Sequence, residues 1–167
     1  LSKSPKKPEL FAAPGNGGIA ALAKCVDIKA TDVEGMVKFA KENQYIQYTI
    51  DGKDYLYKIF GVFFEKEYKL DIYHQGDYTE KEMKDYIKQI KESSFYDYDV
   101  EVLENDKIIT LSTCTRFFEG TTKQFVVVGR MVREDEKVKK YDVKANAKYK
   151  EIKEIMKGDD NDEKTEV

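Results

Sequence analysis

The chain lacks tryptophan, and its 167 residues include one histidine and two cysteines. It also lacks an apolar run of 18 or more residues, which is the length that a membrane-spanning helix requires. The opening residues, LSKSPKKPEL, contain no apolar stretch of the kind found in signal peptides. The sequence as written therefore predicts neither a signal peptide nor a membrane anchor.

An excess of charge of one sign is missing as well. The 29 basic and 32 acidic residues are interspersed and leave a formal net charge of -3. Binding to nucleic acid depends on a basic field that meets the phosphates, so we expect no nucleic-acid partner. The two cysteines, Cys25 and Cys114, lie far apart in different contexts, and no spacing pattern supports a disulfide between them. We expect both to be reduced thiols.

Apolar and aromatic residues are plentiful. The hydrophobic content of 41% is enough to fill a core, and the length allows one ordinary domain or two small ones. The 12 tyrosines and 9 phenylalanines favour sheet-rich packing, in which large rings cover a pleated surface. The composition therefore predicts a globular chain with a large sheet component.

The first part of the chain mixes small residues and glycines. An apolar run from Leu10 to Ala13 leads into Pro14-Gly15-Asn16-Gly17-Gly18 and then into small residues from Ile19 to Ala23. This pattern predicts a strand, a tight glycine turn and a short helix or loop. Thr31 and Glu34 form a capping box before apolar residues at helical spacing, which predicts a helix over 32–42.

From Tyr45 the apolar period changes to two. Residues 45–50, a turn at Asp51-Gly52 and residues 55–64 predict a β-hairpin whose second strand is buried on both faces. A second capping box, Thr79 with Glu82, predicts a helix that ends near Ser93. The middle of the chain is thus expected to combine a hairpin with one amphipathic helix.

Three further strands are expected after this helix, over 99–103, 107–113 and 124–132, with Cys114 directly at the end of the second. After Glu134 the chain becomes strongly charged. Ala145, Tyr149, Ile152, Ile155 and Met156 have the spacing of one helix, and residues 158–167 form an acidic segment that we expect to be disordered.

The strand before Cys114 carries the most specific pattern. The run Thr110-Leu111-Ser112-Thr113-Cys114 is followed, ten residues after the cysteine, by Gln124 and the valines of Gln124-Phe125-Val126-Val127-Val128. These two segments resemble the last two strands of class B sortases, where a Thr-Leu-Ser-Thr-Cys strand carries the nucleophile and the next strand carries an arginine before a run of valines. The strand at 55–60 and the helix after Thr79 resemble earlier elements of the same family. The resemblance covers about 44–132.

This resemblance implies an α+β fold: a partial sortase-like β-barrel, made of C-terminal strands plus one helix, after an N-terminal α/β fragment. It implies a cysteine transpeptidase at the extracellular face of the bacterial membrane, which attaches surface proteins to the cell wall. Such enzymes cut a sorting signal of the Asn-Pro-Gln-Thr-Asn type after threonine, hold the acyl group as a thioester and pass it to an amine. The implied partners are a sorting-signal peptide and a cell-wall amine nucleophile, with no cofactor and no metal.

The resemblance also assigns residues to roles. Cys114 would be the catalytic nucleophile, whereas its alternative role is that of a buried structural cysteine. The implied substrate pocket consists of Ser112, Thr113, Arg116 and Gln124. Gln124 stands where the family has arginine, and an amide donates a hydrogen bond without the charge of a guanidinium.

Two of the family's groups have no direct counterpart. The family's histidine lies upstream of the middle strand in a Gly-His-Asn type segment, whereas the one histidine here, His74, follows that strand and would have to be recruited as acid or base. Arg130 does not replace the missing arginine, because it lies six residues beyond Gln124, roughly 20 Å away at about 3.3 Å per residue. We therefore expect the transpeptidase domain to be incomplete and inactive alone.

Residues 1–43 resemble another family. The run LFAAPGNGGI at 10–19, the residues Cys25-Val26-Asp27-Ile28 and the helix after Thr31 resemble an internal piece of phosphoribosylamine-glycine ligase, an ATP-grasp enzyme. The ATP-grasp domain with its metal-binding carboxylates has no counterpart, so we expect no ligase activity and a structural role for the glycine turn. The join of two unrelated fragments near Asn43 indicates a chimera. The expected organisation is the fragment 1–43, an incomplete sortase B-like domain 44–133 and a charged tail 134–167.

Two other functions remain open at this point. One is a noncatalytic module in which a pocket beside Cys114 holds a peptide strand without cutting it. The other is a nucleotide-binding domain built from the glycine turn, which has the weaker support because no catalytic residues surround that turn.

Overall fold

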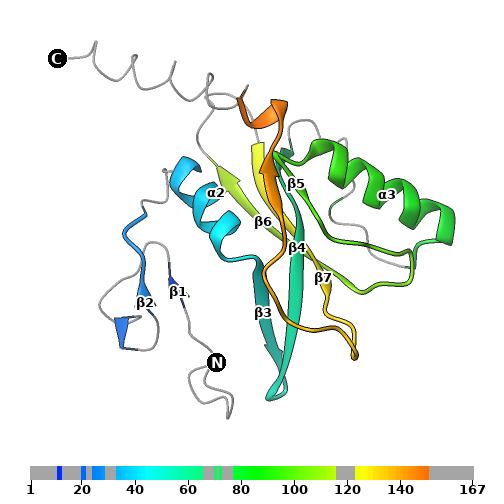
Figure 1. The fold of residues 1–167 in the computed structure, drawn as a ribbon, viewed down its shortest axis with the longest axis horizontal. Helices are drawn as coiled ribbons and strands as arrows, with labels where there is room; N and C mark the ends of the chain where they lie inside the picture. The colour runs from blue at the N-terminus through cyan, green and yellow to red at the C-terminus, as the bar shows by residue number, and fades with distance from the viewer. Residues whose placement is uncertain are drawn as a thin grey trace.

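A four-stranded antiparallel sheet forms the centre of the computed structural model, with the strand order β3-β4-β7-β6 (Figure 1). The strands are β3 (Tyr45–Ile50), β4 (Lys53–Glu65), β6 (Ile108–Thr115) and β7 (Lys123–Met131). The residues that the structure describes are 11–12, 20–21, 24–28, 33–65, 70, 72, 77–115 and 123–150.

The β3–β4 hairpin follows from its turn residues. Asp51 and Gly52 have φ angles of 50° and 74°, which is the backbone pattern of the type I′ turn that Asp-Gly favours. The register pairs Ile50 with Lys53 and continues to the pair of Tyr45 with Lys58. The predicted hairpin is confirmed, and the predicted burial on both faces holds for the second half of β4, where residues 58–65 are all buried.

Beyond Lys58, β4 stays in the interior of the sheet because other segments replace β3 beside it. On one side it pairs with β7 as far as Glu65 opposite Gln124, with a register shift between Ile59 and Gly61. On the other side Phe95 N donates to Val62 O at 2.9 Å, and Val62 N donates to Ser94 Oγ at 3.2 Å. Both edges of β4 are therefore hydrogen-bonded as far as Val62.

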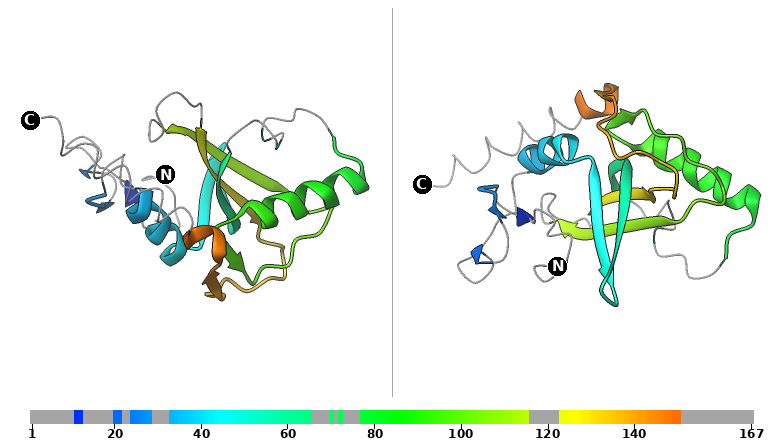
Figure 2. Two further views of the ribbon diagram at one scale, coloured as in Figure 1. Left: turned by 90° about the horizontal axis from the view of Figure 1, so that it is seen from above. Right: turned by 60° about the horizontal axis from the view of Figure 1, so that its bottom comes forward.

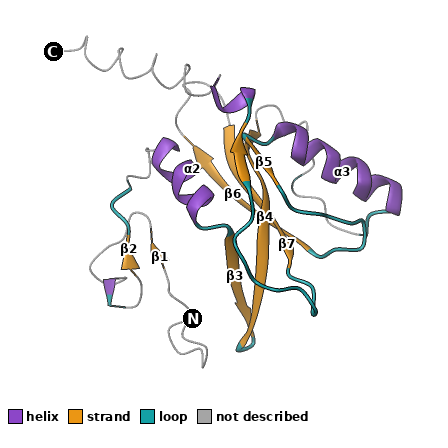
Figure 3. Cartoon of the chain, in the orientation of Figure 1, coloured by secondary structure: helices purple, strands orange, loops and turns teal. Residues whose placement is uncertain are grey.

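Helix α3 (Glu80–Ser93) begins and ends as predicted. Thr79 caps it, since its side chain accepts from Glu82 N while its own backbone N–H donates to the Glu82 carboxylate at 2.8 Å. The helix lies alongside the sheet, and α2 lies on the other side of the strands (Figure 3). The buried residues of α3, which are Tyr86, Ile87 and Ile90, join the core.

A small second sheet differs from the prediction. The expected strand at 99–103 is wrong: the strand here is β5 (Tyr96–Tyr98), which pairs antiparallel with β8 (Val143–Ala145). The register ends at Tyr98 opposite Val143, and only Asp99 N to Asp142 O continues it, at 2.9 Å. Residues 99–103 still alternate between exposed and more buried positions, so the sequence pattern reflects an extended segment that lacks a paired strand.

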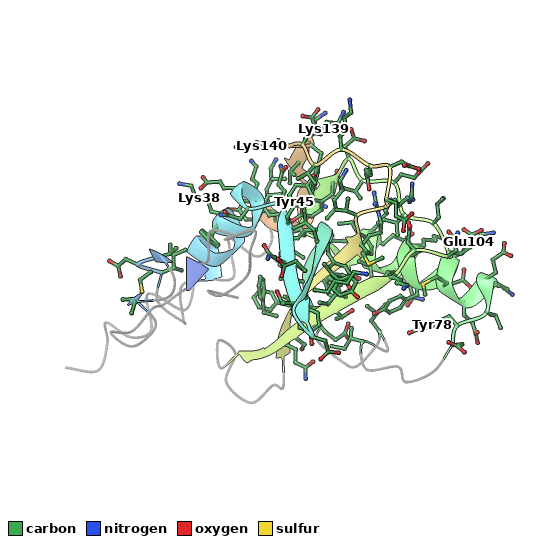
Figure 4. All side chains as sticks on the ribbon, turned by 90° about the horizontal axis from the view of Figure 1, so that it is seen from below. Lys38, Tyr45, Tyr78, Glu104, Lys139 and Lys140 are labelled. Atoms are coloured by element: carbon green, nitrogen blue, oxygen red, sulfur yellow. The ribbon has the colours of Figure 1, made fainter. Side chains whose placement is uncertain are left out.

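The segment before β8 packs on the central sheet. Tyr45 lies beside Lys139 and Lys140 in Figure 4, and its hydroxyl donates to Lys139 O at 2.6 Å. Tyr141 O accepts from Gln44 Nε2 at 2.7 Å. Ala145 is the last residue of β8 and not part of a helix, while residues 147–150 are helical as expected. The rest of the expected helix and the acidic segment lie outside the described residues.

The N-terminal part pairs within itself. Strand β1 (Phe11–Ala12) runs parallel to β2 (Lys24–Cys25), and α2 (Val33–Glu42) occupies nearly the range predicted from its capping box. The glycine turn at 14–18 lies outside the described residues.

The expectation was a partial β-barrel, and the part of the chain that the structure describes forms no closed barrel. The four-stranded sheet has β3 and β6 as its outer strands (Figure 2). The fold is therefore α+β around an open sheet.

Candidate functional site

The candidate site lies where β6 and β7 approach their shared loop. Their antiparallel register places Cys114 directly opposite Gln124, and on the far side of β7 the partner of Gln124 is Glu65 of β4. A cysteine, an amide and a carboxylate thus occupy neighbouring positions across three strands. Directly opposite residues in an antiparallel pair have Cα atoms about 4.5–5.5 Å apart, so the register fixes Gln124 close to Cys114.

Ser112 connects this row to the surface. Its Oγ donates a hydrogen bond to Gln124 Oε1 at 3.1 Å, while Ser112 itself is exposed. Gln124 and Glu65 are buried, with relative exposures of 8% and 7%. The hydrogen bond orients the amide so that its oxygen faces the serine, which gives Gln124 a fixed side chain at the border between core and solvent.

The structure brings together three of the residues predicted from the sequence: Cys114, Ser112 and Gln124. Thr113, opposite Phe125, is placed by its backbone only, as is Cys114. Arg116 and His74 lie outside the described residues, so their predicted roles stay predictions.

Sequence reasoning missed Glu65. It is the last residue of a long apolar strand, and its carboxylate is buried next to Gln124 in the register. A charged residue at the end of an apolar run is usually a solvated strand terminus, which is why the sequence gave no reason to select it. Its place beside the candidate site depends on the pairing of β4 with β7, which is information about tertiary structure.

Arg130 lies at the other end of β7 and has a structural environment. It is 1% exposed and is paired in the register with Ile108 on one side and Lys58 on the other. Its Nη2 donates to Glu136 Oε1 at 3.0 Å, its Nη1 contacts the second oxygen of the same carboxylate, and its Nε donates to Glu101 O at 3.1 Å.

The other partner of this carboxylate is Lys58, whose Nζ donates to Glu136 Oε1 at 2.5 Å. We call Lys58, Arg130 and Glu136 the Arg130 cluster. Hydrogen bonds from Arg130, and then from Lys58, outweigh the effect of burial and hold the pKa of Glu136 well below its usual range. The guanidinium is thus engaged in a buried ion pair remote from Cys114.

A second ion pair lies next to this cluster. Arg133 donates to both carboxylate oxygens of Asp106, at 2.9 and 2.8 Å, and to Glu101 at 2.8 Å. Burial alone would raise the pKa of Asp106, but the hydrogen bonds from Arg133 and Leu103 N and the nearby charges lower it overall. Arg133 and Asp106 line an open hollow of about 590 Å³ together with Leu103, Asn105, Lys107, Met131, Val132 and Glu134.

That hollow is remote from the candidate site. Lys107 at its wall lies seven residues before Cys114, or roughly 23 Å along a strand at about 3.3 Å per residue. Among the described residues no group of three or more His, Cys, Asp or Glu side chains is arranged to hold a metal ion. None of the described helices is long and apolar enough to span a membrane.

The N-terminal part matches a ligase family. The family described as "Phosphoribosylglycinamide synthetase, N domain" matches residues 1–61, so this match extends over β3 and into β4. The phosphoribosylamine–glycine ligase of Caldanaerobacter subterraneus subsp. tengcongensis is 41% identical over 54 residues, which are 32% of this chain and 13% of that protein.

The larger part matches sortase B. The sortase B of Staphylococcus aureus is 27% identical over 96 residues, covering 57% of this chain and 38% of that protein. The crystal structure of S. aureus sortase B complexed with MTSET superimposes with a TM-score of 0.51 and 25% identity, over 64% of this chain and 46% of that one. This chain thus spans less than half of each of these proteins. In sequence and in fold, then, the chain resembles part of sortase B, and its N-terminal residues resemble a fragment of phosphoribosylamine–glycine ligase.

Proposed function

We propose that this chain carries a sortase-type cysteine transpeptidase domain that is incomplete and inactive alone. The observation that supports the proposal most is the position of Cys114, within a Thr-Leu-Ser-Thr-Cys strand and directly opposite Gln124. The substrates would be the sorting-signal peptide of a surface protein and an amine of the cell wall. The place of action would be the extracellular face of a bacterial membrane.

The proposed chemistry begins with attack of the Cys114 thiolate on the carbonyl carbon of the scissile peptide bond. The C–N bond then breaks, the departing amine takes a proton, and the acyl group remains as a thioester until a second amine displaces the thiolate. Gln124 is the proposed donor to the tetrahedral oxyanion, because a fixed amide N–H stabilises developing negative charge.

Two features support the inactive state. A neutral amide provides a weaker hydrogen bond to an oxyanion than a guanidinium does, since charge-assisted hydrogen bonds are roughly twice as strong. An amine is also a poor leaving group unless an acid protonates it. General acid catalysis typically raises the reaction rate by a factor of about 10² to 10⁴. The only histidine of the chain is His74.

The direct test combines peptide binding with peptide cleavage. An Asn-Pro-Gln-Thr-Asn peptide is expected to slow the labelling of Cys114 by a thiol reagent, in a Cys25→Ser background, whereas a scrambled peptide is not. Mass spectrometry is expected to show no cleavage product. Cleavage that disappears in Cys114→Ala would overturn the inactive part of the proposal, and equal labelling rates with both peptides would overturn the proposed substrate site.

The replacement of arginine by Gln124 favours a second candidate, a noncatalytic module that binds the peptide strand without cutting it. The two candidates differ in what they require of the thiol. If the module only binds, Cys114→Ala leaves the peptide affinity unchanged in calorimetry and no thioester forms. A thioester adduct of the chain with the peptide, trapped at acid pH, would contradict this second candidate.

A further inference from the structure

Lysines are concentrated in the segment that contains β8. The stretch KVKKYDVKANAKYK at 137–150 contains six lysines and one aspartate, although the whole chain has a net charge of -3. All six of these lysines are exposed. Basic and acidic residues are thus balanced over the chain as a whole but not within this stretch.

Helix α2 adds two exposed lysines on the same side of the molecule. It lies beside the segment that contains β8 (Figure 1, Figure 2), and its Lys38 projects from the same side as Lys139 and Lys140 in Figure 4. Lys41 Nζ lies 5.9 Å from the ring centroid of Tyr96 in β5, which pairs with β8. We give the name lysine patch to Lys38, Lys41, Lys137, Lys139, Lys140 and Lys148.

The charge of the lysine patch is not neutralised by ion pairs. Within the described residues, none of its lysines pairs with a carboxylate, and the exposed acids Glu42 and Asp142 are not paired with them either. Glu136 is held in the Arg130 cluster. Lys144 is left out of the patch because it lies directly opposite Asp97 in the register of β5 and β8. The patch therefore presents a local positive field to solvent.

The type of cation indicates what the patch binds. All six residues are lysines, which carry compact charges on flexible stems, whereas arginine has the planar fork that holds one phosphate or carboxylate with two hydrogen bonds. The hollow of about 590 Å³ beside Arg133 is lined by none of these lysines. The lysine patch is thus suited to a surface that displays many anionic groups and not to a single small anion.

An exposed apolar side chain stands within the patch. Val138, between Lys137 and Lys139, is 60% exposed, more than any other large hydrophobic residue that the structure describes. Its segment is held in place by Tyr45, whose hydroxyl donates to Lys139 O at 2.6 Å and accepts from Lys139 N at 3.1 Å. A soluble polyanion offers no apolar environment to this valine. A bilayer does, because lysines can stay among the headgroups while an apolar side chain enters the boundary with the acyl chains.

We propose that the lysine patch binds the surface of a bilayer that contains anionic phospholipids, with Val138 at the boundary between headgroups and acyl chains. Several lysines near an anionic surface add their contributions, so the binding is reversible and depends on salt. The proposal goes beyond the proposed function and does not rest on it, since neither Cys114 nor Gln124 takes part.

Flotation of the full chain with lipid vesicles tests the proposal. The chain is expected to float with vesicles of phosphatidylglycerol and phosphatidylcholine in equal parts, and not with vesicles of phosphatidylcholine alone. An ionic strength of about 1 M, at which the screening length is about 3 Å, is expected to release it. The combined substitution Lys137→Gln, Lys139→Gln and Lys140→Gln is expected to lower the partition coefficient about tenfold or more.

The matched control removes the same charge elsewhere. Lys53→Gln, Lys81→Gln and Lys88→Gln together change exposed residues of β4 and α3, and are expected to change the partition coefficient less than about threefold. An equal loss of binding in the two triple variants would overturn the proposal, because it would make net charge and not the patch responsible. A full chain that does not float with the anionic vesicles would overturn it as well.

A fluorescent reporter tests the position of Val138 directly. The chain lacks tryptophan, so Val138→Trp introduces a single indole into the patch. Its emission is expected to shift to the blue with anionic vesicles, whereas that of Leu103→Trp, at a residue that is 40% exposed elsewhere, is expected to stay unchanged. If the chain binds soluble polyphosphate and vesicles leave the emission of Val138→Trp unchanged, the patch recognises a soluble polyanion, which contradicts the proposal.

Discussion

Cys114 and Gln124 are directly opposite each other in the register of two adjacent strands, and this pairing bears on the chemistry that we propose for the site. The hydrogen bond from Ser112 to Gln124 holds the amide in one orientation. A neutral amide at this position does not favour the thiolate form of a neighbouring cysteine in the way that a cation does. The effect of a charge at position 124 on this thiol can therefore be tested by substitution.

Gln124→Arg tests this reasoning. A guanidinium opposite Cys114 is expected to lower the thiol pKa, and a shift of about one unit raises the thiolate fraction at neutral pH about tenfold. The measurement is the rate of thiol labelling against pH in a Cys25→Ser background. Gln124→Met, which is neutral and of similar size, is expected to show no such gain. Identical pH profiles for the two variants would mean that residue 124 does not influence the thiol.

Glu136 illustrates a different use of charge. In the Arg130 cluster its carboxylate accepts hydrogen bonds from a buried arginine and a buried lysine, which depresses its pKa. The unfolded chain therefore takes up a proton near the ordinary value of 4.5, whereas the folded chain does not. Since the unfolded state binds more protons in this range, the free energy of unfolding falls as the pH falls below that value.

Glu136→Gln is expected to lower the free energy of unfolding at pH 7 by about 3 kcal/mol, because it removes the carboxylate that pairs with both buried Lys58 and buried Arg130. It is also expected to flatten the dependence of stability on pH in the acid range. Urea unfolding at a series of pH values measures both effects. Glu134→Gln is the control, since Glu134 is exposed two residues away. Equal acid sensitivity of the two variants would show that the cluster does not couple folding to protonation.

Individual residues were predictable to different degrees. The proximity of Cys114 and Gln124 was predictable from the resemblance of two successive strands to a known family, because five adjacent residues and a ten-residue spacing are both visible in sequence. Glu65, Glu136 and the partners of Arg130 were not. Lys58 and Glu136 are 78 residues apart, so their contact is decided by the packing of the segment after β7 and leaves no periodic signal.

At the scale of elements, the contact of α3 with β4 depends on one glycine. A Cβ at Gly61 would lie 2.3 Å from Ile90 Cγ2, and Ile90 is fully buried. Gly61→Ala is therefore expected to cost about 1–3 kcal/mol in chemical denaturation. In an Ile90→Ala background the same substitution is expected to cost clearly less, because the colliding methyl group is gone. Additive effects of the two substitutions would place the cost elsewhere than in this contact.

The elements with strong local signals were the ones predicted correctly. The Asp51-Gly52 turn and the Thr79 capping box defined the hairpin and helix α3, because turn conformation and helix capping are determined by neighbouring residues. β5 and β8 have three residues each, and each becomes a strand only because the other lies beside it. The alternation over 99–103 is present, but a strand also needs a partner, and among the described residues the pairing of this segment ends with the bond from Asp99 N to Asp142 O.

At the scale of the whole molecule, the folded unit that contains the central sheet extends past the end of β7. Asn146 Nδ2 donates to Ser94 O at 2.8 Å, and Tyr141 contacts both Gln44 and Ile59 through its hydroxyl group. The segment that follows β7 thus holds the junction of β3, β4 and β5. β1 and β2, in contrast, pair with each other and not with this sheet.

Two truncations test the division of the chain. A chain that begins at Gln44 is expected to keep cooperative unfolding with a midpoint within a few degrees of that of the full chain. A chain that ends at Arg133 is expected to lose cooperative unfolding, because it lacks Glu136, Tyr141 and β8. Circular dichroism during heating measures both. Loss of folding on removal of residues 1–43 would show that the ligase-like fragment is an integral part of the folded unit.

The measurement that tests the central claim most directly is the labelling of the folded Cys25→Ser chain by a small thiol reagent, followed by intact-mass analysis. The proposed role of Cys114 as a nucleophile at the end of β6 predicts one adduct under native conditions, absent in the additional Cys114→Ala variant. A chain that gains this adduct only after unfolding in urea would have Cys114 as a buried structural residue, and the proposed transpeptidase site would be wrong.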